Sequence, residues 1–164
     1  MVFPIENSTP LTLTQSLVII NYLETIYPSR GSLLPKDPIQ CARTLELVYT
    51  IACDTHPVQN LRILTMQPEE KRADYAQAII ASGLSTFEAL LEPESLSRGY
   101  CVGEQVSLAD LVLVPQVYNA RRWKLDLTPY PRICAICEHL EQLPAFIVAH
   151  PDQQADAPPM TRTD

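Results

Sequence analysis

The segment VSLADLVLVPQV constrains the fold more than any other part of the sequence. Ser107 and Asp110 have the S-x-x-D spacing of a capping box, in which each side chain accepts a hydrogen bond from the other residue's backbone amide. Apolar residues follow without a break from 111 to 114, so the predicted helix is apolar nearly all round. A helix of this kind is covered on every side. We therefore predict a central helix that begins after Ser107, and we expect Pro115 to interrupt it.

Helical periodicity, prolines and capping residues predict further helices on both sides of this one. Asp37 and Pro38 have the pattern of an N-cap followed by proline at the first helical position. Pro57 is expected to kink the helix that starts there, because proline removes a backbone donor and clashes with the preceding turn. The predicted helices cover residues 15–27, 38–66, 68–92, 131–142 and 144–150.

Apolar residues at helical spacing give the two long helices a predicted inner face. The stretch LTLT at 11–14 alternates as a short strand end does, whereas beyond residue 38 no segment reads as a strand. The sequence therefore predicts an all-α protein with a short strand near its beginning. The residues expected to point inward are Ile39, Ala42, Leu45, Val48, Tyr49 and Ala52 in the first helix, and Ala73, Ala76, Ile80, Leu84, Phe87 and Leu91 in the second.

Composition excludes several classes of partner. At 164 residues the chain has room for one domain, or for one and part of another. Its formal charge is −7 and its 12 lysines and arginines are scattered, which argues against nucleic-acid binding. The sequence has no apolar run long enough to span a bilayer and no visible secretory signal in MVFPIENSTP. We expect no membrane or nucleic-acid partner and a cytoplasmic location.

The cysteines and histidines do not form a recognisable reactive site. Cys134 and Cys137 have C-x-x-C spacing, but no second pair stands at ligand spacing and the neighbouring isoleucines suggest a buried helix face. We therefore expect no metal site. His56 is two residues from Asp54, and positions i and i+2 of a helix point to different faces, so His56 is interpreted as structural. His139 and His150 belong to no recognisable constellation.

Five segments together resemble the glutathione transferase family, and most closely its zeta class, the maleylacetoacetate isomerases. They are LTLTQSLVIINYLE, LLPKDPIQCAR, IACDTHPVQNLRIL, YCVGEQVSLADLVLVPQVYNARRWKLDLTPYP and LPAFIVAHPDQQADAP. The resemblance implies a helical transferase C-terminal bundle at residues 38–150. It also implies a remnant of a thioredoxin-like domain at 1–27, a linker at 28–37 and a tail at 151–164, which we expect to be disordered.

The resemblance further implies that most of the thioredoxin-like domain is absent from this chain. The family's Ser-Ser-Cys catalytic motif would lie near the start of that domain, and the sequence contains no such motif. No catalytic residue is therefore assigned. Pro4 lies near the expected place of the family's cis-proline loop, but FPIEN aligns too poorly for an assignment.

Gln15 and Ser16 resemble the pair that holds the γ-glutamyl end of glutathione in the family. Exposed amides at a helix N-terminus, with a hydroxyl and a side-chain amide beside them, suit a carboxylate. The alternative is that Thr14 or Ser16 only caps the helix.

Three further residues are candidates through the resemblance. Gln59 and Asn60 match a PVQNL segment that reaches glutathione, partly from the neighbouring subunit. The alternative is that they satisfy backbone groups freed by the proline-broken helix. Arg122 matches an arginine that meets the acidic substrate, and a guanidinium fork suits a carboxylate. Its alternative is a surface cation at a helix C-terminus, as for Arg121.

Three functions remain open from the sequence. The first is a glutathione-dependent cis–trans isomerase of the maleylacetoacetate isomerase type, or a truncated relative, with glutathione as cofactor and a small acidic or conjugated organic substrate. The second is a recruited biosynthetic isomerase or cyclase that uses the helical-domain pocket without glutathione. The third is a non-catalytic helical interaction module. A homodimer is expected, because helix 15–27 would otherwise expose apolar side chains to water.

Overall fold

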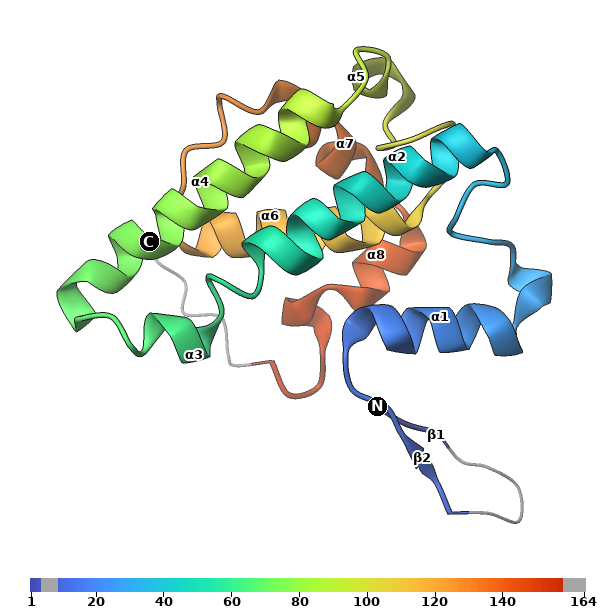
Figure 1. Ribbon diagram of the computed structural model, residues 1–164, viewed down its shortest axis with the longest axis horizontal. Coiled ribbons are helices and arrows are strands. Elements are labelled where there is room, and N and C mark those ends of the chain that lie inside the picture. Colours follow the sequence, from blue (N-terminus) through green and yellow to red (C-terminus); the bar gives the residue numbers. More distant parts are fainter. Residues whose placement is uncertain (4–8, 158–164) are drawn as a thin grey trace. The chain divides into compact units, whose positions relative to one another are not determined.

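The computed structural model describes residues 1–3 and 9–157, so Pro4 lies outside the described residues. The chain forms two compact units, Met1–Leu33 and Leu34–Asp164, and their boundary falls within the predicted linker (Figure 1). Strands in the described residues occur only in the first unit, and the second unit is helical. The predicted all-α class is confirmed. None of the described helices is both long and apolar enough to span a membrane.

The first unit is a small hairpin followed by a helix. Strands β1 (Val2–Phe3) and β2 (Leu11–Thr12) pair antiparallel, and β1 was not predicted from the sequence. Helix α1 (Ser16–Ile26) follows and leads into the short turn η1 (Pro28–Arg30). The Phe3 ring meets the edge of Tyr22 at 4.8 Å, which ties the hairpin to α1.

The second unit begins with a helix whose predicted length is wrong. Asp37 caps α2 (Pro38–Tyr49) as predicted, since its Oδ1 accepts the Gln40 amide at 2.9 Å. The helix widens into π-helical turns at η2 (Thr50–Thr55), where the His56 amide donates to the Ile51 carbonyl at 2.8 Å. It then stops, and α3 (Leu61–Leu64) starts separately. Pro57 therefore ends the helix instead of kinking it, because the proline ring and its missing N–H prevent another turn.

The inner face of α2 also differs from the prediction. Ile39 and Tyr49 are 72% and 50% exposed, and Ala42 is exposed as well. The buried residues of α2 are Thr44, Leu47 and Val48. The buried Thr44 accounts for the error, because its hydroxyl is satisfied by the Gln40 carbonyl at 2.8 Å and a search for apolar residues overlooks it.

Helix α4 matches its prediction more closely. A short turn, η3 (Glu69–Lys71), precedes α4 (Arg72–Leu90), and the expected inner residues are buried except Ala73, which is exposed on the first turn. The helix crosses η2 at Gly83. A Cβ atom at Gly83 would lie 2.1 Å from Thr55 Oγ1, so this close approach requires glycine.

Four helices and a final turn complete the second unit. They are α5 (Ser95–Arg98), α6 (Leu108–Arg122), α7 (Pro131–Leu140), α8 (Pro144–Ala149) and η4 (Pro151–Gln153). Helix α6 contacts α2, η2 and α7 and is the predicted central helix (Figure 1). It runs through Pro115 without interruption, contrary to the prediction, because the surrounding packing supports the helix on both sides of the proline. The start of the predicted disordered tail is folded as η4, while 158–164 lie outside the described residues.

A buried carboxylate fixes the beginning of α6. Asp110 is 0% exposed, and its Oδ2 accepts the backbone amide and the hydroxyl of Ser107, both at 2.7 Å. Both halves of the predicted capping box are present. Asp110 Oδ1 also accepts the Cys101 amide at 2.8 Å, a contact the motif did not predict. The carboxylate thus holds both α6 and the preceding loop.

A second carboxylate supplies a cap from a different helix. Glu88 on α4 accepts the amides of Arg132 and Ile133, each at 3.0 Å, at the N-terminus of α7. Helix α7 has no side-chain cap from its own N-cap residue, Tyr130. Local sequence gives no signal for such a cap, since Glu88 is 44 residues from Arg132 and 45 residues from Ile133.

Replacing Asp110 by alanine tests the role of the buried carboxylate. We expect Asp110→Ala to lower the free energy of unfolding by about 3 kcal/mol, because two buried backbone amides lose their acceptor. Urea unfolding followed by circular dichroism measures the change. Asp126→Ala is the matched control, since Asp126 accepts from Thr128 in an exposed turn and its loss should cost much less. Equal effects of the two substitutions would contradict the assignment.

Candidate functional site

The N-terminus of α1 has an unusual backbone conformation. Gln15, its N-cap residue, has φ 69° and ψ 115°, and only Lys124 shares a positive φ among the described non-glycine residues. Such a conformation costs about 1–3 kcal/mol and persists only where the surrounding structure imposes it. Strain of this kind is often found at binding sites.

Nothing in the described chain caps this helix with a side chain. Gln15 makes no side-chain cap bond, and no side-chain bond of Thr14 or Ser16 to the first turn is present in the described residues. Gln15 and Ser16 are both exposed. The alternative in which Thr14 or Ser16 only caps the helix therefore has no contact to support it, and the first-turn amides remain available to an anion.

Gln59, by contrast, is buried in a network of side-chain amides. It is 2% exposed; its Nε2 donates to Gln116 Oε1 at 3.3 Å and its Oε1 accepts Asn119 Nδ2 at 2.6 Å. His56 Nδ1 lies 3.4 Å from the same Nε2. The network connects the loop after η2 to α6. A glutathione contact by Gln59 stays a prediction.

Asn60 caps the helix that follows it. Its Oδ1 accepts the Ile63 amide at 3.2 Å at the start of α3. This is the local role that the sequence left open as an alternative, and a ligand contact by Asn60 likewise stays a prediction.

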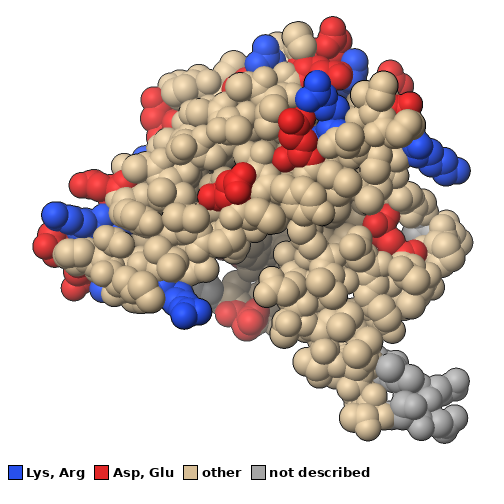
Figure 2. All heavy atoms as spheres, viewed as in Figure 1, with Lys and Arg blue, Asp and Glu red and all other residues tan. Residues whose placement is uncertain are grey.

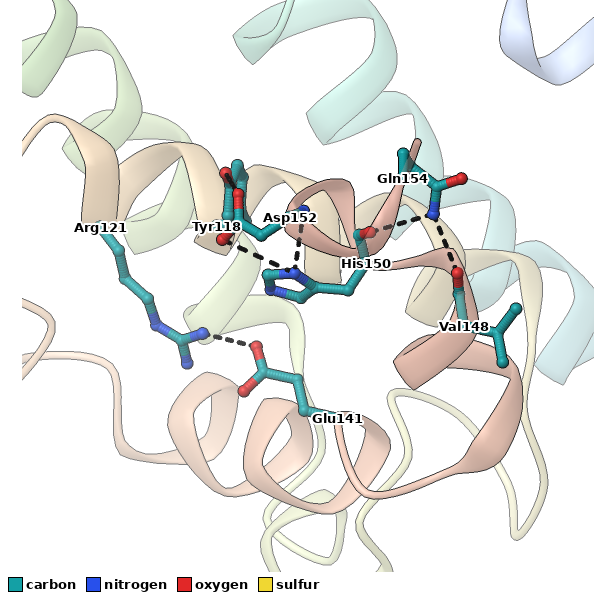
Figure 3. A network of polar contacts seen from close by, with 7 residues as sticks. All are labelled: Tyr118, Arg121, Glu141, Val148, His150, Asp152 and Gln154. Carbon is teal, nitrogen blue, oxygen red and sulfur yellow. Dashed lines mark hydrogen bonds and ion pairs between the residues drawn. The ribbon is translucent and has the colours of Figure 1, made fainter. Parts of the chain in front are cut away.

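Arg121 and Arg122 are adjacent at the end of α6 but differ in their ion pairing. Arg121 forms an ion pair with Glu141 at 2.5 Å (Figure 3). Arg122 is exposed and has no hydrogen bond or ion pair with any residue that the structure describes. Of the two guanidinium groups, Arg122 is the one that can accept a new carboxylate without losing a partner.

A polar cluster that the sequence did not predict lies one turn before Arg122. The Tyr118 hydroxyl donates to Asp152 Oδ1 at 2.8 Å, and the Tyr118 ring meets the edge of His150 at 5.3 Å (Figure 3). The interpretation of His150 as part of no constellation is therefore wrong. The pair Tyr118 and Asp152 is 34 residues apart in sequence, so no local motif could have revealed it.

The remaining titratable residues offer little further chemistry. No group of three or more His, Cys, Asp or Glu residues within 1–3 and 9–157 is arranged to hold a metal ion. His139 Nε2 is buried without a partner in that part of the chain, and its ring packs edge-on against Tyr100 at 4.9 Å. On the face shown in Figure 2, basic side chains are interspersed with acidic ones and form no basic patch.

Comparison with known proteins gives a consistent set of relatives. The sequence pattern of the glutathione S-transferase C-terminal domain matches residues 41–144. A probable maleylacetoacetate isomerase 2 of Drosophila melanogaster is 46% identical over 149 residues, which are 90% of this chain and 64% of the fly protein. The maleylacetoacetate isomerase of Mus musculus is 43% identical over 153 residues, which are 93% of this chain and 69% of the mouse protein.

A similar structure has also been solved. The crystal structure of maleylacetoacetate isomerase from Anaeromyxobacter dehalogenans matches with a TM-score of 0.86 at 37% identity, and the match covers 97% of this chain and 72% of that one. That protein carries dicarboxyethyl glutathione and citrate in its active site.

Thiol labelling tests which cysteines are reactive. Burial raises the pKa of the Cys101 and Cys137 thiols, so both stay protonated at neutral pH, whereas Cys53 is exposed. We expect iodoacetamide to modify Cys53 first at pH 7, and Cys101 and Cys137 only after unfolding in urea. Peptide mass spectrometry measures the order. Rapid modification of Cys137 in the folded protein would instead indicate a reactive C-x-x-C pair.

Proposed function

The chain belongs to the glutathione S-transferase family, among the maleylacetoacetate isomerases, and from this premise we propose that it binds glutathione and an acidic substrate for a cis–trans isomerisation. The names of the relatives support this activity, and the ligands of the bacterial enzyme support the two kinds of ligand. The chain spans 64% of the length of the fly relative, and the proposal concerns the residues that this chain contains.

The conformation of Gln15 carries the proposal. Its positive φ and the absence of a described side-chain cap leave the first turn of α1 open, and a helix N-terminus favours negative charge. The γ-glutamyl carboxylate of glutathione carries the negative charge that the N-terminus of α1 favours. The Ser16 hydroxyl and the Gln15 side chain, both exposed, supply further hydrogen bonds.

The substrate acid is assigned to Arg122. A maleylacetoacetate-type substrate carries carboxylates and a cis double bond conjugated to a carbonyl group, and a guanidinium fork binds a carboxylate in a fixed orientation. Glutathione, when bound, supplies a thiol that adds reversibly to such a double bond and so permits rotation about it. The role of Arg122 is to hold one end of the substrate while the other end turns. Activation of the thiol is assigned to no residue of this chain.

A homodimer is part of the proposal. No residue of α1 is buried, and large apolar side chains of the second unit, such as Ile39, Leu61 and Met66, are 66–76% exposed. Exposed apolar side chains can be covered by a second subunit when they form one contiguous patch, and the proposal is that they do so here.

Removing one hydroxyl tests the glutathione site. Ser16→Ala should weaken glutathione binding about fivefold, equivalent to about 1 kcal/mol for one hydrogen bond, in isothermal titration calorimetry. Thr25→Ala is the control, since the Thr25 hydroxyl bonds to Asn21 within the same helix away from its N-terminus. Unchanged affinity in Ser16→Ala would remove the assignment.

Sedimentation of the same samples records whether the chain is a dimer, and a monomer would contradict that part of the proposal.

The neighbouring arginines give a matched pair for the acid site. Arg122→Ala should raise the Michaelis constant or dissociation constant for an acidic ligand about tenfold or more, because a charge-assisted hydrogen bond is lost. Arg121→Ala should leave that constant unchanged and remove only the ion pair with Glu141. Steady-state kinetics with maleylacetoacetate and calorimetry with fumarate measure both variants. A larger effect from Arg121 would contradict the assignment.

A further inference from the structure

One face of α4 holds the connection that leads from α6 to α7 (Figure 1). Gln77 Nε2 donates to the Trp123 carbonyl at 2.7 Å, at the point where α6 ends. Farther along the connection, the Tyr130 hydroxyl donates to the Ala81 carbonyl at 3.2 Å. Glu88 is the last residue of this face, at the N-terminus of α7. Because positions 77, 81 and 88 are four and seven residues apart, they lie on one side of the helix.

The turn that ends α6 is closed by backbone hydrogen bonds but is strained at Lys124. The Leu125 amide donates to the Ala120 carbonyl at 3.0 Å. The Lys124 amide donates to the Arg121 carbonyl at 2.9 Å, which completes the two bonds of a Schellman motif. This motif usually has glycine at the position of Lys124, whose φ is 56°. A lysine in this conformation persists only where the surrounding structure imposes it, so the turn needs support from outside α6.

The Gln77 side chain supplies such support. The Trp123 carbonyl lies at the C-terminus of α6, where carbonyls lack a partner within the helix, and it accepts from Gln77, 46 residues away. Arg122 immediately precedes Trp123, and its guanidinium has no hydrogen bond or ion pair with any described residue that could hold it. The point from which Arg122 reaches a ligand is therefore set by the backbone of this turn, and through it by Gln77.

We propose that Gln77 is a positioning residue: its bond to the Trp123 carbonyl keeps the last turn of α6 closed and so fixes the point from which Arg122 binds a substrate carboxylate. The substrate part rests on the proposed function of Arg122. A rigid backbone at this point favours binding, because less order has to be gained when the ligand arrives. The effect of Gln77 on the turn itself does not depend on any ligand.

Two variants remove hydrogen bonds from the two ends of the same connection. Gln77→Met removes the donor and keeps the length and helix propensity of the side chain. Tyr130→Phe is the matched control, since its hydroxyl bonds to Ala81 and Ser85, away from the end of α6. We expect both variants to lower the midpoint of thermal unfolding by similar small amounts. Only Gln77→Met should raise the dissociation constant for fumarate in calorimetry, about two- to fivefold, the upper end being the worth of one hydrogen bond.

A double-mutant cycle with Arg122→Gln tests whether Gln77 acts through Arg122. In the Arg122→Gln background, Gln77→Met should leave the remaining affinity for fumarate nearly unchanged, because the group that Gln77 positions is absent. A merely structural role predicts equal weakening in both backgrounds, or equal weakening by Gln77→Met and Tyr130→Phe. Either result would overturn the proposal, as would wild-type affinity in Gln77→Met.

Amide hydrogen exchange without ligand decides the effect on the turn even if the proposed function fails. Nuclear magnetic resonance of the full chain follows the amides of Lys124 and Leu125, which close the turn. We expect Gln77→Met to speed their exchange about two- to fivefold, and Tyr130→Phe to leave it unchanged. Unchanged exchange in Gln77→Met, or an equal increase in both variants, would overturn the inference. Failure of the wild-type protein to bind fumarate would count against the proposed function alone.

Discussion

The buried carboxylate of Asp110 is the interaction on which the second unit depends. A carboxylate that is 0% exposed is costly to desolvate, and here three donors from Ser107 and Cys101 offset that cost. Because those donors come from the loop and from the first turn of α6, one side chain fixes both where the helix begins and how the loop reaches it. The positions of the functional side chains proposed on α6 therefore depend on where this helix begins.

Helix α6 presents two different polar surfaces. Toward the interior, Gln116 and Asn119 bond to Gln59 and connect α6 to the loop that follows Pro57. Toward solvent, Tyr118 bonds to Asp152 of the turn η4, and Arg122 follows one turn later on the same helix. The first surface connects two parts of the fold, although the buried Gln116 Nε2 has no hydrogen-bond partner among the described residues. The second contains a charge without a described partner, and this imbalance is what makes it a candidate for binding.

The sequence predicts best those features whose cause is local. The capping box at Ser107, the Asp37 cap and the buried series of α4 depend on residues within a few positions of each other, and the structure contains all three. Predictions failed where distant contacts decide. Tertiary packing carries α6 through Pro115 and buries Thr44, and a contact across 34 residues bonds Tyr118 to Asp152 in the turn η4, where the predicted tail begins. The sequence also does not predict the positive φ of Gln15, although the family resemblance points to that residue as a candidate.

A crystal structure of the chain with glutathione and fumarate would test the central proposal most directly, namely that the N-terminus of α1 binds glutathione and that Arg122 on α6 binds the substrate acid. The account predicts the γ-glutamyl carboxylate on the first-turn amides of α1 beside Ser16. It also predicts a fumarate carboxylate on the Arg122 guanidinium. Density for glutathione away from α1, or Arg122 paired with a carboxylate of the protein instead of fumarate, would contradict it.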